Sequence, residues 1–185
     1  MKKQIKVTLI VIVAAIIAAA IIWYVMYLRG KEQDLLTPVG TRAEFIGDTD
    51  KYPTMLTAKG TQILNADGEQ VVLKGVMVPE SRSLYEEKKF NEDFYKDVFA
   101  KGGNAIRVPI SPVEYKNDDY YMWRYLDRIV TWAGENDNYV ILDWDYTGNP
   151  IDGSGDEMPD LDENPLDYSA EFWKNIADYF KNTPN

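Results

Sequence analysis

Two aspartates one residue apart, Asp143 and Asp145, close an apolar run that begins at Tyr139. The run from Tyr139 to Leu142 is typical of a buried strand. Because residues two apart on a strand point to the same face, the two carboxylates share one side and Trp144 takes the other. Carboxylates in this arrangement can accept hydrogen bonds from a ligand or exchange protons with it.

A basic residue, Arg107, lies in the preceding predicted strand between Ile106 and Val108, which should face the opposite side. We therefore expect Arg107 to point toward the same side as the two aspartates. An arginine beside carboxylates favours their ionised form. Two interpretations stay open from these residues: a functional site, or an Arg–Asp pair that closes the top of a core.

The elements that must position these side chains alternate between helices and strands. A helix is predicted from the N-cap candidate Asn91 to the glycines after Lys101, and a strand at 104–110. A second helix is predicted at 121–135, and a third from Asp167 or Ser169. The residues expected to point inward are Leu126, Ile129, Val130 and Ala133 on the second helix and Phe172, Ile176, Ala177 and Phe180 on the third.

Upstream of these elements, Ile63-Leu64 and residues 71–73 flank the turn sequence Asn65-Ala66-Asp67-Gly68. This pattern predicts a hairpin, whose second strand should run on through Val78. The whole order predicts an α/β fold with a parallel sheet, and strands that are apolar on both faces indicate a sheet covered on both sides. In such folds functional groups gather beyond the carboxyl ends of the strands, where Asp143 and Asp145 stand.

Composition narrows the possible chemistry. Of the 185 residues, 30 are acidic and 20 are lysine or arginine, and this net charge of -10 argues against nucleic acid as a partner. The chain has no cysteine and no histidine, which excludes disulfides, thiolate catalysis, Ser-His-Asp chemistry and histidine-ligated metals within it. Its thirteen Tyr, five Trp and six Phe suit stacking on neutral, hydroxyl-rich ligands, although core packing explains most single aromatics.

The first segment differs from the rest. Val7–Leu28 is an uncharged run long enough for a membrane-spanning helix, which takes about 20 residues. Lysines precede it within residues 1–6, so we expect a cytoplasmic N-terminus, a signal anchor and a domain outside the cytoplasm. Residues 29–54 are predicted to be a linker. The alternative is a signal peptide cleaved near Ala18-Ala19-Ala20, followed by secretion.

Four stretches carry a resemblance to a known family: "VVLKGVMVP", "FAKGGNAIRVPISP", "YLDRIVTWAGENDNYVILDWDYTGNP" and "FWKNIADYFKNTPN". Residues 55–185 resemble the N-terminal part of glycoside hydrolase family 5, the cellulase family. The resemblance implies a (β/α)8 TIM barrel, of which this chain holds the N-terminal hairpin and the first three strand–helix units. It also implies a cellulase-like endoglucanase or β-glycanase that hydrolyses a β-linked polysaccharide with retention, without a cofactor or metal.

The resemblance also suggests roles for individual residues. Arg107 matches the family's active-site arginine, and Asp143 matches the acid of the family's "DWH" motif. Asp145 stands where a sugar-contacting histidine is usual, so it is expected to bind substrate as an acceptor only. Tyr146 or Tyr168 could stack on sugar. Both catalytic glutamates are expected beyond Asn185, so no catalytic residue is expected in this chain, and the fragment by itself should be inactive.

Three other interpretations follow from the same residues. Asp143 and Asp145 could be a catalytic pair, but retaining glycosidases need their carboxylates across the scissile bond, not side by side on one strand. Asp160, Asp162, Asn164 and Glu171 match positions of a calcium loop, but Pro165 replaces its turn glycine, which favours an ordinary acidic loop. The protein could also be a membrane-anchored, non-catalytic carbohydrate-binding or structural remnant.

Overall fold

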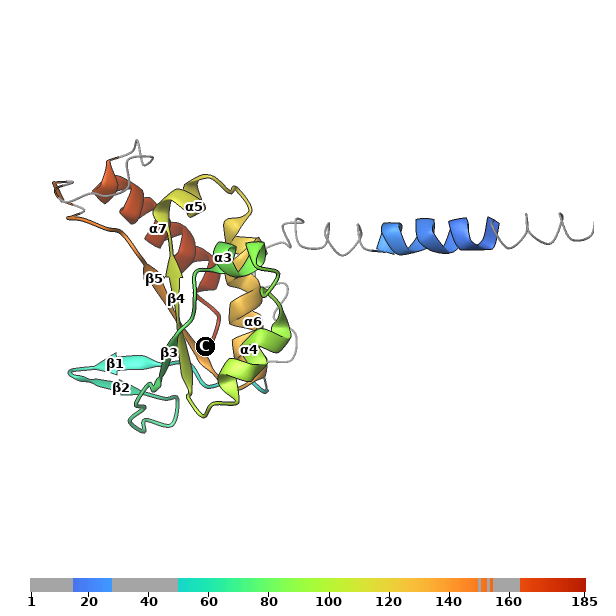
Figure 1. Cartoon of the computed structure of the whole chain (residues 1–185). Coiled ribbons are helices and arrows are strands. Elements are labelled where there is room, and N and C mark those ends of the chain that lie inside the picture. Colours follow the sequence, from blue (N-terminus) through green and yellow to red (C-terminus); the bar gives the residue numbers. More distant parts are fainter. Residues whose placement is uncertain (1–14, 28–49, 150, 153, 155–163) are drawn as a thin grey trace, which may run out of the picture. The chain divides into compact units, whose positions relative to one another are not determined.

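The computed structural model describes residues 15–27, 50–149, 151–152, 154 and 164–185 (Figure 1). The chain divides into two units, Met1–Thr37 and Pro38–Asn185. In the first unit, residues 15–27 form a helix whose side chains are exposed. None of the helices formed by the described residues is both long and apolar enough to cross a membrane. Part of the predicted span Val7–Leu28 lies outside the described residues, and the anchor stays a prediction.

The described residues of the second unit form two sheets and six helical segments. An antiparallel pair joins β1 (Thr57–Lys59) to β2 (Gln62–Leu64), and a parallel sheet contains β3 (Gly75–Met77), β4 (Ala105–Ile110) and β5 (Tyr139–Trp144) in that order. The helical segments are α3 (Ser81–Glu86), α4 (Glu92–Phe99), α5 (Pro112–Lys116), η1 (Met122–Leu126), α6 (Asp127–Glu135) and α7 (Pro165–Phe180).

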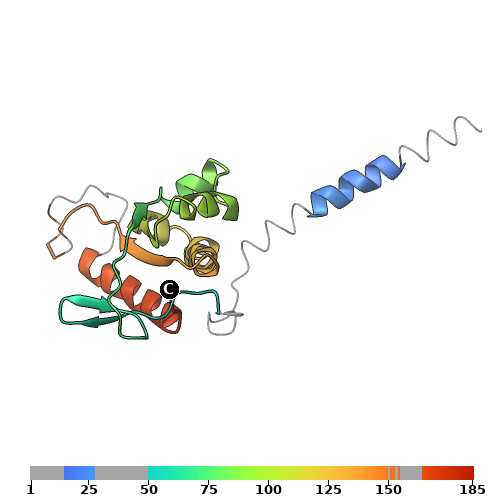
Figure 2. The same ribbon diagram turned by 90° about the horizontal axis from the view of Figure 1, so that it is seen from below.

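Each parallel strand is followed by helical structure, as the alternating pattern predicts (Figure 1). Figure 2 shows the β1–β2 pair set apart from the parallel sheet. Gly75 is needed where β3 meets β4, because a Cβ there would collide with the backbone carbonyl of Ala105. The chain therefore folds as three consecutive β–α units preceded by a hairpin.

The core lies between the parallel sheet and the helices. Ile106, Val108 and Ile110 of β4 are buried in one cluster with side chains from α4, α6 and α7. The alternate residues face away from the helices, and there Met77 is 61% and Ile141 42% exposed. The prediction of a sheet covered on both sides is wrong for the described residues, because their helices pack on one face only.

Local signals explain where the helices begin. The Asn91 side chain accepts a hydrogen bond from the Phe94 N–H and caps α4, as predicted. Asn164 caps α7 in the same way, and Pro165 occupies its first turn, so α7 begins slightly earlier than predicted. Phe172 and Ile176 point inward as expected. The expectation for Ala177 is wrong: it lies one turn from Trp173 on the exposed face of α7.

The N-terminal hairpin differs from the prediction in its second strand. The Asn65 turn forms, with the Asn65 side chain accepting hydrogen bonds from the N–H groups of Asp67 and Glu69. Strand pairing then continues only through a bridge between Leu64 and Gln70, and β3 begins separately at Gly75. The Asn104 side chain accepts a hydrogen bond from the Lys74 N–H. This bond holds the residue just before β3 against the segment that leads into β4.

Candidate active site

The structure brings Arg107 and Asp143 together on the face of the sheet opposite the helices. Nη2 of Arg107 lies 2.7 Å from Oδ2 of Asp143, and the two side chains are 52% and 23% exposed. This contact confirms that Arg107 points to the side of the sheet that carries Asp143. The pair is a charge-assisted contact that solvent or a ligand can still reach.

Strand register explains how the two residues meet. In the parallel pairing of β4 and β5, Pro109 lies opposite Asp143, and Arg107 lies opposite Ile141. All four side chains therefore share one face. The long arginine side chain has to extend past one pleat to reach the carboxylate.

Asp145 lies just beyond the end of β5 and is exposed. Its N–H donates a hydrogen bond of 3.0 Å to the Ile110 carbonyl, so the chain stays extended beside β4 for one residue more. Its carboxylate makes no ion pair with a described residue. Asp145 therefore keeps its acceptor oxygens available at the carboxyl end of the sheet.

The residues on either side of Asp145, Trp144 and Tyr146, make contacts within the protein. Trp144 turns to the helix side and stacks on Phe172, with ring centroids 4.0 Å apart. Tyr146 is half-buried, and its N–H donates to the Trp144 carbonyl. Tyr168 packs against Trp144 from α7, with centroids 5.5 Å apart. Of the two tyrosines suggested for sugar stacking, Tyr168 thus lies on the helix side and covers the core.

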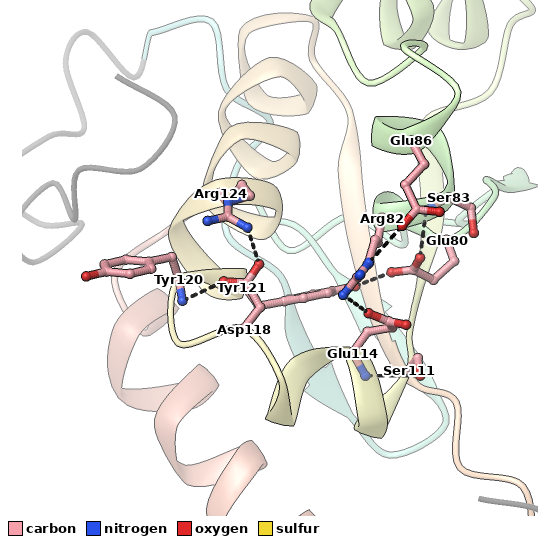
Figure 3. A network of polar contacts seen from close by, with 10 residues as sticks. All are labelled: Glu80, Arg82, Ser83, Glu86, Ser111, Glu114, Asp118, Tyr120, Tyr121 and Arg124. Carbon is pink, nitrogen blue, oxygen red and sulfur yellow. Dashed lines mark hydrogen bonds and ion pairs between the residues drawn. The ribbon is translucent and has the colours of Figure 1, made fainter. Parts of the chain in front are cut away.

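A polar network at the same end of the sheet was not anticipated from sequence (Figure 3). The Tyr121 hydroxyl donates to Glu80, which follows β3, at 2.5 Å. Burial, and next the Glu80 charge, raise the pKa of Tyr121 well above its usual range. Arg82 bridges Glu86 at 3.1 Å and Glu114 at 2.5 Å, and so joins α3 to α5. The network ties together the loops that follow β3 and β4.

Two sequence signals could have found this network. Glu80 lies just before α3 and caps it by accepting from the Ser83 N–H at 3.0 Å. Ser111 and Glu114 form the S-x-x-E pattern of a capping box around Pro112, which predicts the short helix α5. The ion pair of Arg82 with Glu86 has the i,i+4 spacing of a helix pair, which is also a local signal. The pair with Glu114 has no such signal, because Glu114 lies far from Arg82 in sequence.

Comparison with known families identifies the family of this chain. The family model described as cellulase (glycosyl hydrolase family 5) matches residues 64–185. The chain belongs to glycosyl hydrolase family 5. A search of curated proteins found no match to it.

Two solved structures of larger proteins match part of this family 5 chain's fold to different degrees. A β-glucanase from Saccharophagus degradans in complex with cellotetraose superposes with a TM-score of 0.65 and 23% identity, over 74% of this chain and 41% of that one. A β-mannanase from Streptomyces thermolilacinus with mannohexaose gives a TM-score of 0.48 at 23% identity, over 71% and 39% of the two chains. The chain spans about two fifths of the β-glucanase, 41%, and shares the fold of that part.

Metal binding has no support in the described part of this family 5 chain. It contains no group of three or more acidic, histidine or cysteine side chains placed to hold an ion. Of the calcium-loop candidates, Asn164 accepts hydrogen bonds from the N–H groups of Leu166 and Asp167 as the cap of α7. Glu171 lies inside α7, and Asp160 and Asp162 lie outside the described residues.

Proposed function

We propose that the complete protein is a retaining endo-β-glycanase acting on a β-linked polysaccharide outside the cytoplasm. The observation that carries the proposal is the ion pair between Asp143, near the carboxyl end of β5, and Arg107 of the adjacent parallel strand β4, in a chain of glycosyl hydrolase family 5. That end of the sheet is where β/α barrels hold their active sites. The reaction needs no cofactor, because two carboxyl groups of the protein carry it.

In this proposal Arg107 and Asp143 organise the cleft and do not act on the bond. Retaining hydrolysis uses an acid/base and a nucleophile about 5–5.5 Å apart on opposite sides of the glycosidic bond. The resemblance leads us to expect both glutamates beyond Asn185. The Arg107 guanidinium favours the ionised form of a nucleophile placed beside it. Asp143 holds that guanidinium in one orientation through the 2.7 Å contact.

Asp145 and Tyr146 are proposed to contact the substrate. Asp145 is exposed at the sheet end, where its carboxylate can accept hydrogen bonds from sugar hydroxyls. Tyr146 follows it directly and offers an aromatic ring to a sugar face. The negative net charge of -10 suits a neutral glycan better than an anionic one. We further propose that Val7–Leu28 anchors the protein in a membrane.

The test is hydrolysis by the protein encoded by the complete reading frame. It should release reducing ends from hydroxyethylcellulose or β-mannan, both neutral polymers, and NMR of the first products should show the β-anomer before mutarotation. Release of the α-anomer first would contradict retention. Binding of both polymers without hydrolysis would instead support the membrane-anchored, non-catalytic alternative.

A further inference from the structure

A groove of about 580 Å³ lies on the helix side of the sheet, between the segment that follows α5, the π-helical segment η1 and α7. Its aromatic lining residues include Trp123, Tyr168 and Tyr179. Its polar lining residues include three side chains of α7, Glu171, Asn175 and Asp178. The candidate active site lies on the other face, because Arg107 and Asp143 alternate with the β-strand residues buried against the helices. The sheet therefore separates the two sites.

The shape of the groove depends on η1. Its π-helical hydrogen bond runs from the Asp127 N–H to the Met122 carbonyl, which widens the chain before α6 begins. Segments of this kind are rare and occur frequently at functional sites. Two residues of η1, Met122 and Trp123, line the groove. Trp123 is half-buried, and its indole Nε1 is covered by protein without a hydrogen-bond partner among described residues.

The lining chemistry suits a neutral, hydroxyl-rich ligand. Glu171, Asn175 and Asp178 follow at spacings of four and three residues, so they form a row along one face of α7. All three are exposed, and Asp178 has only a distant contact of 3.9 Å with Lys181. Their oxygens can accept hydrogen bonds from successive hydroxyls, while the aromatic side chains offer apolar surfaces.

We propose that this groove is an accessory binding site for a β-linked oligosaccharide, separate from the catalytic cleft. The proposal rests on the proposed function for the class of ligand. A strand of polysaccharide held here would keep the enzyme on an insoluble substrate while the opposite face of the sheet carries out hydrolysis. Tethering of this kind raises the effective concentration of substrate at the second site.

The test measures binding of cellohexaose, in a thio-linked form that glycosidases do not hydrolyse, to the complete protein by calorimetry, in a detergent without a sugar headgroup. Trp123→Ala should weaken binding by about tenfold or more, a loss of the size found when an aromatic ring that stacks on a nucleic-acid base is removed. Asn175→Ala, which changes an exposed residue and leaves the core intact, should weaken it by a smaller factor. Trp173→Ala is the matched control, because Trp173 is 42% exposed on α7 and lies outside the groove.

Two cleft variants distinguish this inference from the proposed function. Arg107→Ala and Asp145→Asn should leave cellohexaose binding to the groove unchanged. If these variants abolish binding and Trp123→Ala does not, the ligand occupies the cleft, which overturns the accessory site and leaves the proposed function standing. Three other results would also overturn the accessory site. The unaltered protein could fail to bind, Trp123→Ala and Trp173→Ala could have equal effects, or the groove could bind Ca²⁺ in place of sugar.

Discussion

Arg107→Ala tests whether the ion pair with Asp143 serves activity or only the fold. The two side chains are 52% and 23% exposed, so their contact resembles a surface ion pair. Such pairs contribute about 0–1 kcal/mol to the free energy of unfolding, and we expect a loss within that range. The effect on activity should be much larger, because the substitution removes a positive charge next to the proposed nucleophile. Loss of one such electrostatic group typically lowers kcat by about 100-fold or more.

The assay compares two variants of the complete protein. kcat/KM is measured on a β-linked oligosaccharide, and the free energy of unfolding is measured in urea. Asp145→Asn is the matched control, because it keeps the shape of the side chain and one acceptor oxygen. Arg107→Ala should lower kcat/KM at least about tenfold more than Asp145→Asn does, which corresponds to about 1.4 kcal/mol of transition-state stabilisation.

Two results would refute this reasoning. If Asp145→Asn abolishes turnover and Arg107→Ala leaves it nearly intact, Asp145 is a catalytic acid and its match to the family's histidine position is wrong. If Arg107→Ala costs about 3 kcal/mol of unfolding free energy or more, the pair behaves as a buried one. In that case the interpretation of Arg107 and Asp143 as the closure of a core is correct.

Four further predictions concern stability and location. Phe172→Ala should cost about 3–5 kcal/mol in urea unfolding, because Phe172 is fully buried against Trp144, whereas Trp173→Ala should cost less than about 1 kcal/mol. Because the pKa of Tyr121 is raised on folding, the unfolded state should ionise first, and stability should fall as the pH rises above about 10, by up to about 1.4 kcal/mol per pH unit from this group. Tyr121→Phe should reduce that slope; an unchanged slope would exclude this cause. Residues 55–185 expressed alone should aggregate or pack loosely, since β5 pairs only with β4 among the described strands and leaves an open edge, and sharp cooperative unfolding of a monomer would contradict this. Protease added to intact cells should digest the chain beyond the proposed anchor, and full protection would exclude the proposed orientation.

Local patterns in the sequence determined most of the secondary structure. The apolar residues of 104–110 predicted β4. Alternation placed Ile106 on the side opposite to Arg107, and the structure shows that Ile106 is buried there. The Asn91 cap predicted the start of α4, since capping involves atoms only a few residues apart. The parallel order of the sheet followed from the alternation of strands and helices, because parallel neighbours need a crossover between them. The resemblance to family 5 was confirmed by the family match.

Only the tertiary structure decided the contacts between distant residues. Alternation placed Arg107 and Asp143 on one side of the sheet, but their 2.7 Å contact depends on the register between β4 and β5. The exposure of Ala177 depends on which side of α7 meets the sheet, and composition alone cannot distinguish two moderately apolar faces.

The network of Glu80 with Tyr121 and the groove beside Trp123 also needed the folded chain. Glu80 and Tyr121 lie 41 residues apart and meet only because α3 and η1 pack at the same end of the sheet. The π-helical hydrogen bond in η1 replaces an ordinary helical one, and the sequence around it has an ordinary helical period. Local sequence determines which elements form, whereas the packing of those elements decides which side chains meet and where a cavity remains.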